Sequence, residues 1–157
     1  MTLYFLLKYL HVIGAAVLLG TGAGIASFML RAHLSEDANV IAAVARIVVL
    51  GDFLFTATAV VAQPLTGLAL VHMAGYSVQE SWIVLSLVLY VLTGAFWLPV
   101  VLIQIQIRNL AARSIADGKP LPSRYHSLFR IWFAFGFPAF GAVMAILWLM
   151  ISKPAIY

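Results

Sequence analysis

Residues 3–30 form an apolar run, LYFLLKYLHVIGAAVLLGTGAGIASFML, that lacks the polar face of a soluble helix. Lys8 and His11 are its only basic residues, and it contains no acidic residue. A surface helix of a soluble domain shows polar side chains every three or four residues, and this run does not. Because about 20 apolar residues are enough to cross the hydrocarbon core of a bilayer, the run predicts a transmembrane helix.

Three more apolar runs complete the predicted fold. The four helices are expected at about residues 3–30, 40–73, 81–110 and 125–151, with a short turn at 74–80 and the longest polar connection at 108–126. Only 9% of the residues are charged, whereas soluble domains carry about 25%. Inside lipid, helices satisfy every backbone hydrogen bond within one segment, and runs of this length are not barrel strands. We therefore predict one transmembrane domain over residues 1–157, an all-α four-helix bundle of up-down-up-down order.

Basic residues gather on one side of the predicted bundle. Seven of the nine Lys and Arg residues lie in or beside the first and third connections, and the opposite side has only Lys8 and Lys153. By the positive-inside rule these two connections are cytoplasmic and both termini lie outside, which in a bacterium predicts a multi-pass protein of the inner membrane. This placement explains the net charge of +4, so no nucleic-acid partner is expected. The absence of cysteine excludes disulfides and thiolate metal sites.

Each predicted helix carries one face with polar or small residues, and these faces are expected to meet at the centre of the bundle. Helix two shows this best, through the series Asp52, Thr56, Ala59, Gln63 and Thr66. A carboxylate inside the membrane is costly without a partner. We therefore predict an intramembrane ion pair between Asp52 and Arg130, with Arg46 as the alternative partner. Its role is either structural, or it moves protons or anchors a ligand.

His11 lies at lipid depth and shares its helix face with small residues. Such an imidazole either hydrogen-bonds a facing helix or serves as an axial ligand of haem b, which also needs small residues where the macrocycle lies and aromatic walls. His72 is the best candidate for a second ligand of the haem iron, because it lies on the same side. The residues expected to bind and line this cofactor are His11, His72, Gly14, Gly22, Tyr90, Trp97 and Phe137.

The remaining histidines and the known catalytic motifs indicate no further reaction or metal site. His33 falls in a predicted loop and is expected to be solvated, and His126 begins the fourth helix. The chain has no HExxH, P-loop or GxSxG motif. A copper or zinc site at His11 and His72 lacks a third ligand.

Four stretches carry a resemblance to a known family, at residues 6–33, 60–70, 80–101 and 125–154. Through them nearly the whole chain resembles a bacterial family of small four-helix integral membrane proteins classed as a domain of unknown function. More distantly, KYLHVIG at residues 8–14 is similar to the first-helix motif of the HemJ-type protoporphyrinogen oxidases, which are membrane proteins that bind haem b. This resemblance implies that the functional histidine is His11. The chain departs from that family at residues 82–87, WIVLSL, which lack the lysine that the family needs for activity.

Three functions remain open on these grounds. The first is a haem-b membrane protein with a redox or electron-transfer role, working with a quinone or a porphyrin; as an enzyme, it would be a haem-dependent membrane oxidoreductase. The second is a non-enzymatic membrane subunit or assembly factor, whose small-residue ridge of Ala16, Gly20 and Gly24 packs against a second copy or a larger complex. The third is a metal-handling or transport protein. The lipid bilayer is an expected partner in each case.

Overall fold

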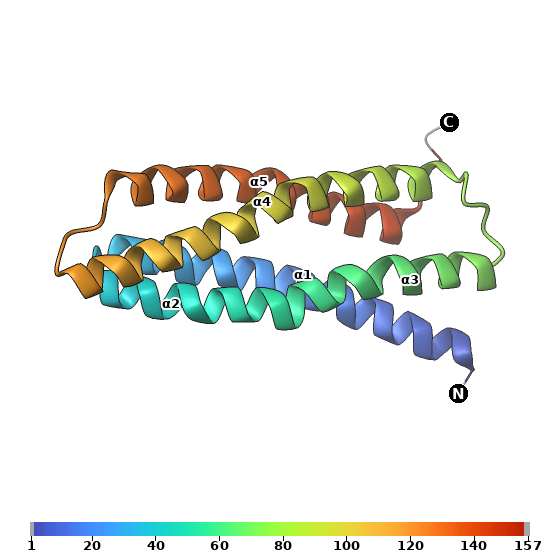
Figure 1. The fold of residues 1–157 in the computed structure, drawn as a ribbon. Coiled ribbons are helices and arrows are strands. Elements are labelled where there is room, and N and C mark those ends of the chain that lie inside the picture. The colour runs from blue at the N-terminus through green and yellow to red at the C-terminus, as the bar shows by residue number, and fades with distance from the viewer. Residues whose placement is uncertain (1, 156–157) are drawn as a thin grey trace.

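A computed structural model of the chain describes residues 2–155, which form helices and short connections without a strand. The elements are α1 (Leu3–Leu34), α2 (Ala38–Gly51), the π-helical turn η1 (Asp52–Thr56), α3 (Ala57–Met73), α4 (Ser81–Asp117) and α5 (Ser123–Ser152). Because α2, η1 and α3 join into one span, these residues contain four helical spans long and apolar enough to cross a membrane. Figure 1 shows that consecutive spans run in opposite directions. The predicted all-α membrane bundle is confirmed.

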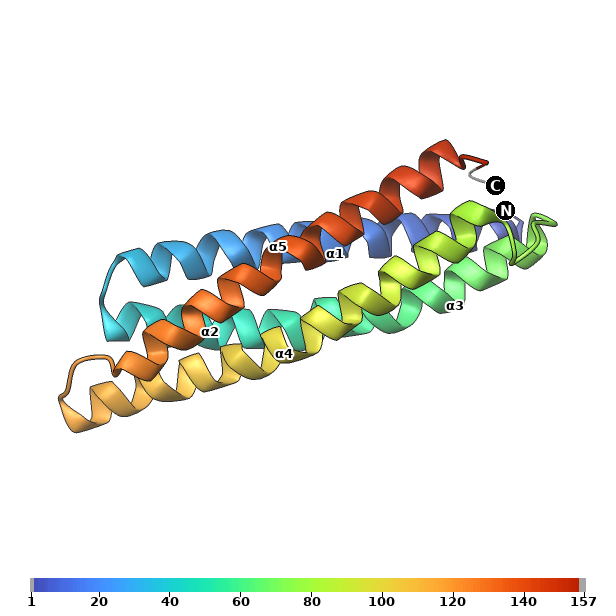
Figure 2. The same cartoon turned by 90° about the horizontal axis from the view of Figure 1, so that it is seen from above.

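The two ends of the bundle carry different connections. We call the end with residues 35–37 and 118–122 the arginine end, and the end with residues 74–80 and both chain termini the termini end (Figure 2). Residues 74–80 connect α3 to α4 where the turn was predicted. The long connection predicted at 108–126 is wrong, because α4 continues to Asp117.

A buried face explains why α4 continues beyond the end of its apolar run. Ala111 and Ser114 are both buried beyond the predicted helix end, so packing continues although the sequence has become polar. Gly118 then ends the helix at φ +61°. There its N–H donates to the Ile115 carbonyl, and the N–H of Lys119 donates to the Ser114 carbonyl. A left-handed glycine with these two bonds is a common helix ending. In the same way α1 continues past residue 30 to Leu34.

Apolar packing is concentrated toward the arginine end, in what we call the packed half. There α1, α2, α4 and α5 share one core made of Ile25, Met29, Ala32, Ile41, Ala45, Val48, Ile103, Ile107, Ala111, Tyr125, Phe129 and Trp132. The loose half, toward the termini end, has a separate small cluster of Trp82, Ile83 and Leu149. In Figure 1, α1 and α3 run apart from α4 and α5 in this half.

The polar face predicted for helix two is confirmed. Asp52, Thr56 and Ala59 are buried, and Gln63 and Thr66 are half-buried. The π turn η1 was not predicted. In it the N–H of Ala57 donates to the Asp52 carbonyl, one residue farther back than in an α-helix. Such single π turns inside helices are frequent at functional sites.

Candidate functional site

His11 of α1 is held by two polar side chains of α3. Its Nδ1 lies 2.9 Å from the Thr66 hydroxyl, and the Gln63 side-chain N–H donates to the His11 carbonyl at 2.8 Å. Gln63 and Thr66 are three residues apart and therefore lie on the same face of α3. The two α3 residues were expected to point inward, but their pairing with His11 was not predicted. The signal for it was present in their spacing on that face.

The Thr66 hydroxyl contacts both His11 Nδ1 and the backbone of its own helix. This hydroxyl has one hydrogen, which it donates to the Ala62 carbonyl at 2.7 Å. With its hydrogen in that bond, the hydroxyl accepts from His11, and the matching tautomer of the imidazole carries its proton on Nδ1. Nε2 then presents a lone pair, and no hydrogen bond within residues 2–155 occupies it. The arrangement exposes a neutral imidazole nitrogen to an electrophile or a metal.

Two glycines allow α1 and α3 to approach each other at this point. A Cβ on Gly67 would lie 3.1 Å from His11 Cε1, so the imidazole fills the space that a side chain would take. A Cβ on Gly14 would overlap with the Gln63 side-chain nitrogen. Both glycines therefore make room for the contacts that position His11.

The other residues predicted to line the cofactor do not gather around His11. His72 is exposed near the end of α3, and Phe137 is 65% exposed on α5. Trp97 lies beside Asp52, and a Cβ on Gly22 would meet nothing within 4 Å. Of the predicted set, the structure brings only Gly14 to the His11 site. Helical periodicity groups the residues of one helix on a face, but it does not tell which residues of different helices lie at the same depth.

Tyr90 has a different partner, and the reason lies in Pro64. A proline inside a helix lacks the N–H that would bond the carbonyl four residues earlier, here that of Val60. The Tyr90 hydroxyl of α4 donates to this Val60 carbonyl. The side chain thus replaces the missing backbone bond and joins α4 to α3 in the loose half.

Asp52 is 4% exposed at the boundary between the two halves. Its carboxyl faces the Thr56 hydroxyl and the side chains of Trp97 and Gln104 from α4. The structure does not bring Arg130 to Asp52: Arg130 is exposed on α5, and within residues 2–155 neither residue forms a salt bridge. The two residues do not pair because the long side chain of Arg130 lies exposed on the surface of α5, whereas Asp52 points into the bundle.

Buried polar atoms without partners lie on three residues around Asp52 and on Trp132 of the core. Four buried side-chain atoms lack a hydrogen bond within the described residues, namely Thr56 Oγ1, Trp97 Nε1, Gln104 Oε1 and Trp132 Nε1. Buried polar atoms are nearly always bonded in folded proteins, so each of these raises the free energy of the folded state. The region around Asp52 is the least satisfied part of the interior.

His33 is not solvated as expected. It lies on the last turns of α1, where its ring stacks on Phe129 with centroids 3.7 Å apart and planes 13° from parallel. A hydrogen bond of 3.1 Å joins its Nδ1 to the hydroxyl of fully buried Tyr125. His126 approaches the same ring edge-on at 6.0 Å. The extension of α1 beyond its apolar run carries His33 into the packed half, and this was not visible from hydropathy.

Comparison with known proteins gives a family and no close relative. Within residues 2–155, no group of three or more His, Cys, Asp or Glu side chains could hold a metal ion, so the geometry adds no third ligand to His11 and His72. No curated protein and no solved structure matches the chain. Residues 5–154 match the family described as predicted integral membrane protein (DUF2269). The chain therefore belongs to the DUF2269 family of integral membrane proteins.

Proposed function

We propose that this protein binds haem b in the membrane and has a redox or electron-transfer role, with His11 as an axial ligand through Nε2. The observation that supports this most is the bond between His11 Nδ1 and the Thr66 hydroxyl, which leaves the lone pair of Nε2 available to a metal. Histidines that bind metals almost always donate their other ring N–H in this way. The donor chemistry at His11 thus fits an axial ligand.

The neighbouring residues have distinct roles in this proposal. Thr66 orients the ring, Gln63 holds the backbone of α1 through the His11 carbonyl, and Gly67 gives the ring its place. His72 is the proposed second ligand and would have to approach from the exposed end of α3. Haem would supply one-electron chemistry, with a quinone or a porphyrin as the proposed partner. We further propose that the arginine end faces the bacterial cytoplasm, because seven of the nine basic residues lie there.

An absorption spectrum of detergent-purified protein tests the haem proposal. Protein expressed with ample haem should show a Soret band that sharpens on reduction with dithionite. We expect the band to be lost in His11→Ala and retained in His33→Ala, since His33 lies in the packed half. Thr66→Val should weaken haem binding about 10- to 100-fold, because it removes the acceptor that orients the ring. A flat spectrum from the wild type, or a band unchanged in His11→Ala, would refute the proposal.

The alternative is a membrane subunit that acts by helix packing, and one observation favours it. Ala16 and Gly20 are exposed on α1, and a Cβ on Gly20 would meet nothing within 4 Å. Small residues four apart allow two membrane helices to approach closely. Under this proposal Gly20→Leu abolishes a homodimer or a larger complex, measured by cross-linking in native membranes, and leaves the fold intact. A colourless protein that stays monomeric would exclude both functions.

A further inference from the structure

A second kind of site lies on the outside of the bundle in the packed half. Between α2 and α4 the surface forms a pocket of about 360 Å³, lined by Arg46, Val49, Leu50, Phe53 and Arg108. Four of these residues come from the second span, three from α2 and Phe53 from the π turn η1. Their spacing of three, one and three positions places them on one face of that span. The pocket therefore has a cationic part, lined by Arg46 and Arg108, and an apolar part, lined by residues of the second span.

Neither arginine of this pocket has an acidic partner. Within residues 2–155 neither guanidinium forms a salt bridge. Arg108 donates through Nε and Nη2 to the Asn109 side-chain oxygen, at 3.1 and 3.0 Å. These bonds orient the guanidinium and leave three of its five N–H groups for another acceptor. The pocket is thus prepared for an anion that the chain does not supply.

The apolar wall continues into the surface that faces the membrane. Leu50 is 57% exposed and Phe53 is 56% exposed, so both are available to acyl chains. Arg46 and Phe53 are seven residues apart, which is about 10 Å along a helix. The arginine lies nearer the arginine end and the phenylalanine nearer the bilayer centre. A phospholipid has the same order, with a phosphate at the membrane surface and acyl chains below it.

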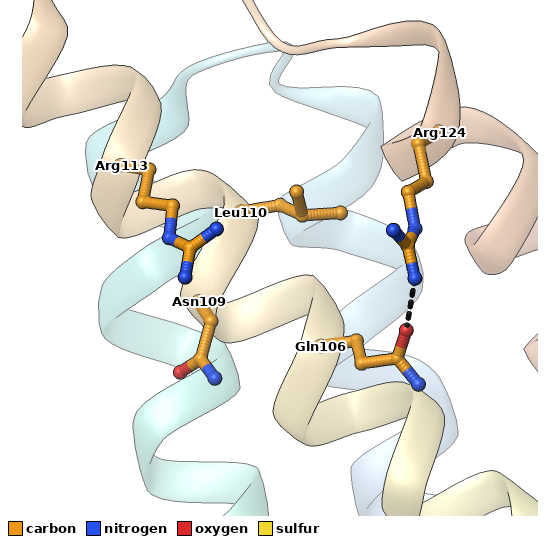
Figure 3. A pocket seen from close by; sticks show the side chains of 5 residues that line it. All are labelled: Gln106, Asn109, Leu110, Arg113 and Arg124. Atoms are coloured by element: carbon orange, nitrogen blue, oxygen red, sulfur yellow. Dashed lines mark hydrogen bonds between the residues drawn. The ribbon is translucent and has the colours of Figure 1, made fainter.

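A neighbouring basic pocket lacks these properties and serves as a comparison. It has about 130 Å³ and is lined by Gln106, Asn109, Leu110, Arg113 and Arg124. Figure 3 shows that one of its arginines, Arg124, already donates to the Gln106 side-chain oxygen, at 3.0 Å. Leu110 is its one apolar lining residue, so it offers no wall for an acyl chain.

We propose that the α2–α4 pocket is a binding site for an anionic phospholipid. The headgroup phosphate lies between Arg46 and Arg108, and an acyl chain follows Leu50 and Phe53. Arginine is suited to this role because its planar fork can bond two phosphate oxygens at once. Basic pockets between membrane helices on the charged leaflet recognise anionic headgroups in this way. The bound lipid ties α2 to α4 in the packed half, independently of any haem at His11.

Native mass spectrometry of the full chain in detergent tests this site. The protein is titrated with phosphatidylglycerol, with phosphatidylcholine of the same acyl chains, and with inorganic phosphate. Phosphatidylglycerol should bind saturably and more tightly than phosphatidylcholine, and inorganic phosphate should not displace it. The double variant Arg46→Gln/Arg108→Gln should bind about 25-fold more weakly, at about fivefold per arginine. The matched variant Arg113→Gln/Arg124→Gln removes the same charge at the same end and should bind like the wild type.

Four results would overturn the proposal. Equal losses in the two double variants would show diffuse attraction to positive charge rather than a site. Displacement of the lipid by inorganic phosphate would show that a free anion is the ligand. Unchanged affinity in Leu50→Ala/Phe53→Ala would show that no acyl chain follows α2. The variant Arg46→Lys/Arg108→Lys keeps the charge but loses the planar fork, so it should bind more tightly than the glutamine variant and more weakly than the wild type. Binding no tighter than in the glutamine variant would show that charge does not contribute.

Discussion

The packed half and the loose half are built from the same four spans but are held together by different interactions. In the packed half, twelve buried residues from four helices form one apolar core. In the loose half, α4 and α5 share a cluster of three buried residues, while α1 and α3 are joined by the bonds of Gln63 and Thr66 to His11. Each intramembrane hydrogen bond contributes only about 0.6 to 2 kcal/mol. The packed half therefore supplies most of the apolar packing that stabilises the fold, and the loose half depends more on individual hydrogen bonds.

The boundary between the halves explains why they differ. Asp52 begins the π turn there, and the buried polar atoms that lack partners lie on the residues around it or on Trp132 of the core. Toward the arginine end the four spans share one apolar core. Toward the termini end α1 and α3 are joined by polar bonds, while α4 and α5 keep a small apolar cluster.

The largest effect should come from the same substitution made in each half of α4. Ile107 is fully buried in the packed core, and Ile83 is 3% exposed in the small cluster of the loose half. Ile107→Ala should lower the free energy of unfolding by about 3 to 5 kcal/mol and Ile83→Ala by about 2 kcal/mol, since a site that can collapse loses less. Unfolding by SDS in mixed micelles, followed by tryptophan fluorescence, measures both. Equal losses would mean that the two halves are equally tightly packed.

A double-mutant cycle tests the bond that joins α4 to α3. Tyr90→Phe leaves the Val60 carbonyl without a donor, because Pro64 has no N–H to offer. The loss in stability should be about 1 to 2 kcal/mol, the cost of an unsatisfied buried acceptor. In the Pro64→Ala background the helix supplies its own N–H, so Tyr90→Phe should then have almost no effect. Equal effects of Tyr90→Phe in both backgrounds would show that the hydroxyl does not replace the missing backbone bond.

Much of the fold was predictable because the membrane imposes it. Four apolar runs gave four spans, and the series from Asp52 to Thr66 gave the inward face of the second span. The helix ends near the arginine end were missed, because outside the hydrocarbon region a helix such as α4 can continue with polar residues as long as one face stays buried. Hydropathy indicates which part of a helix lies in the hydrocarbon core, and it does not indicate where the helix ends.

The candidate site was only partly predictable. His11 stood out as a histidine in an apolar run, and its place in the structure keeps it the centre of the site. Its partners Gln63 and Thr66, and the α4 neighbours of Asp52, depend on how the helices are rotated and shifted against each other. The π turn Asp52–Thr56 adds one residue to a turn in the middle of the second span, and it contains no glycine or proline that would indicate it in the sequence. The helical period of 3.6 residues shows which residues share a face of one helix. Which residues they contact on the next helix depends on how the two helices pack.

Two glycines of α1 differ in whether a neighbouring helix lies close to them. Gly14→Ala would place its Cβ against the Gln63 amide and break the bond to the His11 carbonyl, whereas Gly22→Ala would meet nothing. Alanine favours a helix over glycine by about 1 kcal/mol. Gly22→Ala should therefore raise stability by about this amount, and Gly14→Ala should gain nothing because the lost bond offsets the propensity. A gain in both variants, measured by thermal denaturation in detergent, would show that Gln63 does not hold α1.

The smallest expected effect distinguishes a bonded hydroxyl from an unbonded one on the same helical face. Thr66 accepts from His11, whereas the Thr56 hydroxyl is buried without a partner at the boundary. Valine keeps the shape of threonine and removes only the hydroxyl. Thr66→Val should lower the free energy of unfolding by about 0.6 kcal/mol, the average for a hydrogen bond between membrane helices. Thr56→Val should cause no loss, because it removes a buried polar group that gains nothing from its surroundings. A loss in Thr56→Val equal to that in Thr66→Val would mean that Thr56 bonds the Asp52 carboxyl. The boundary would then be a satisfied polar network that ties the two halves together.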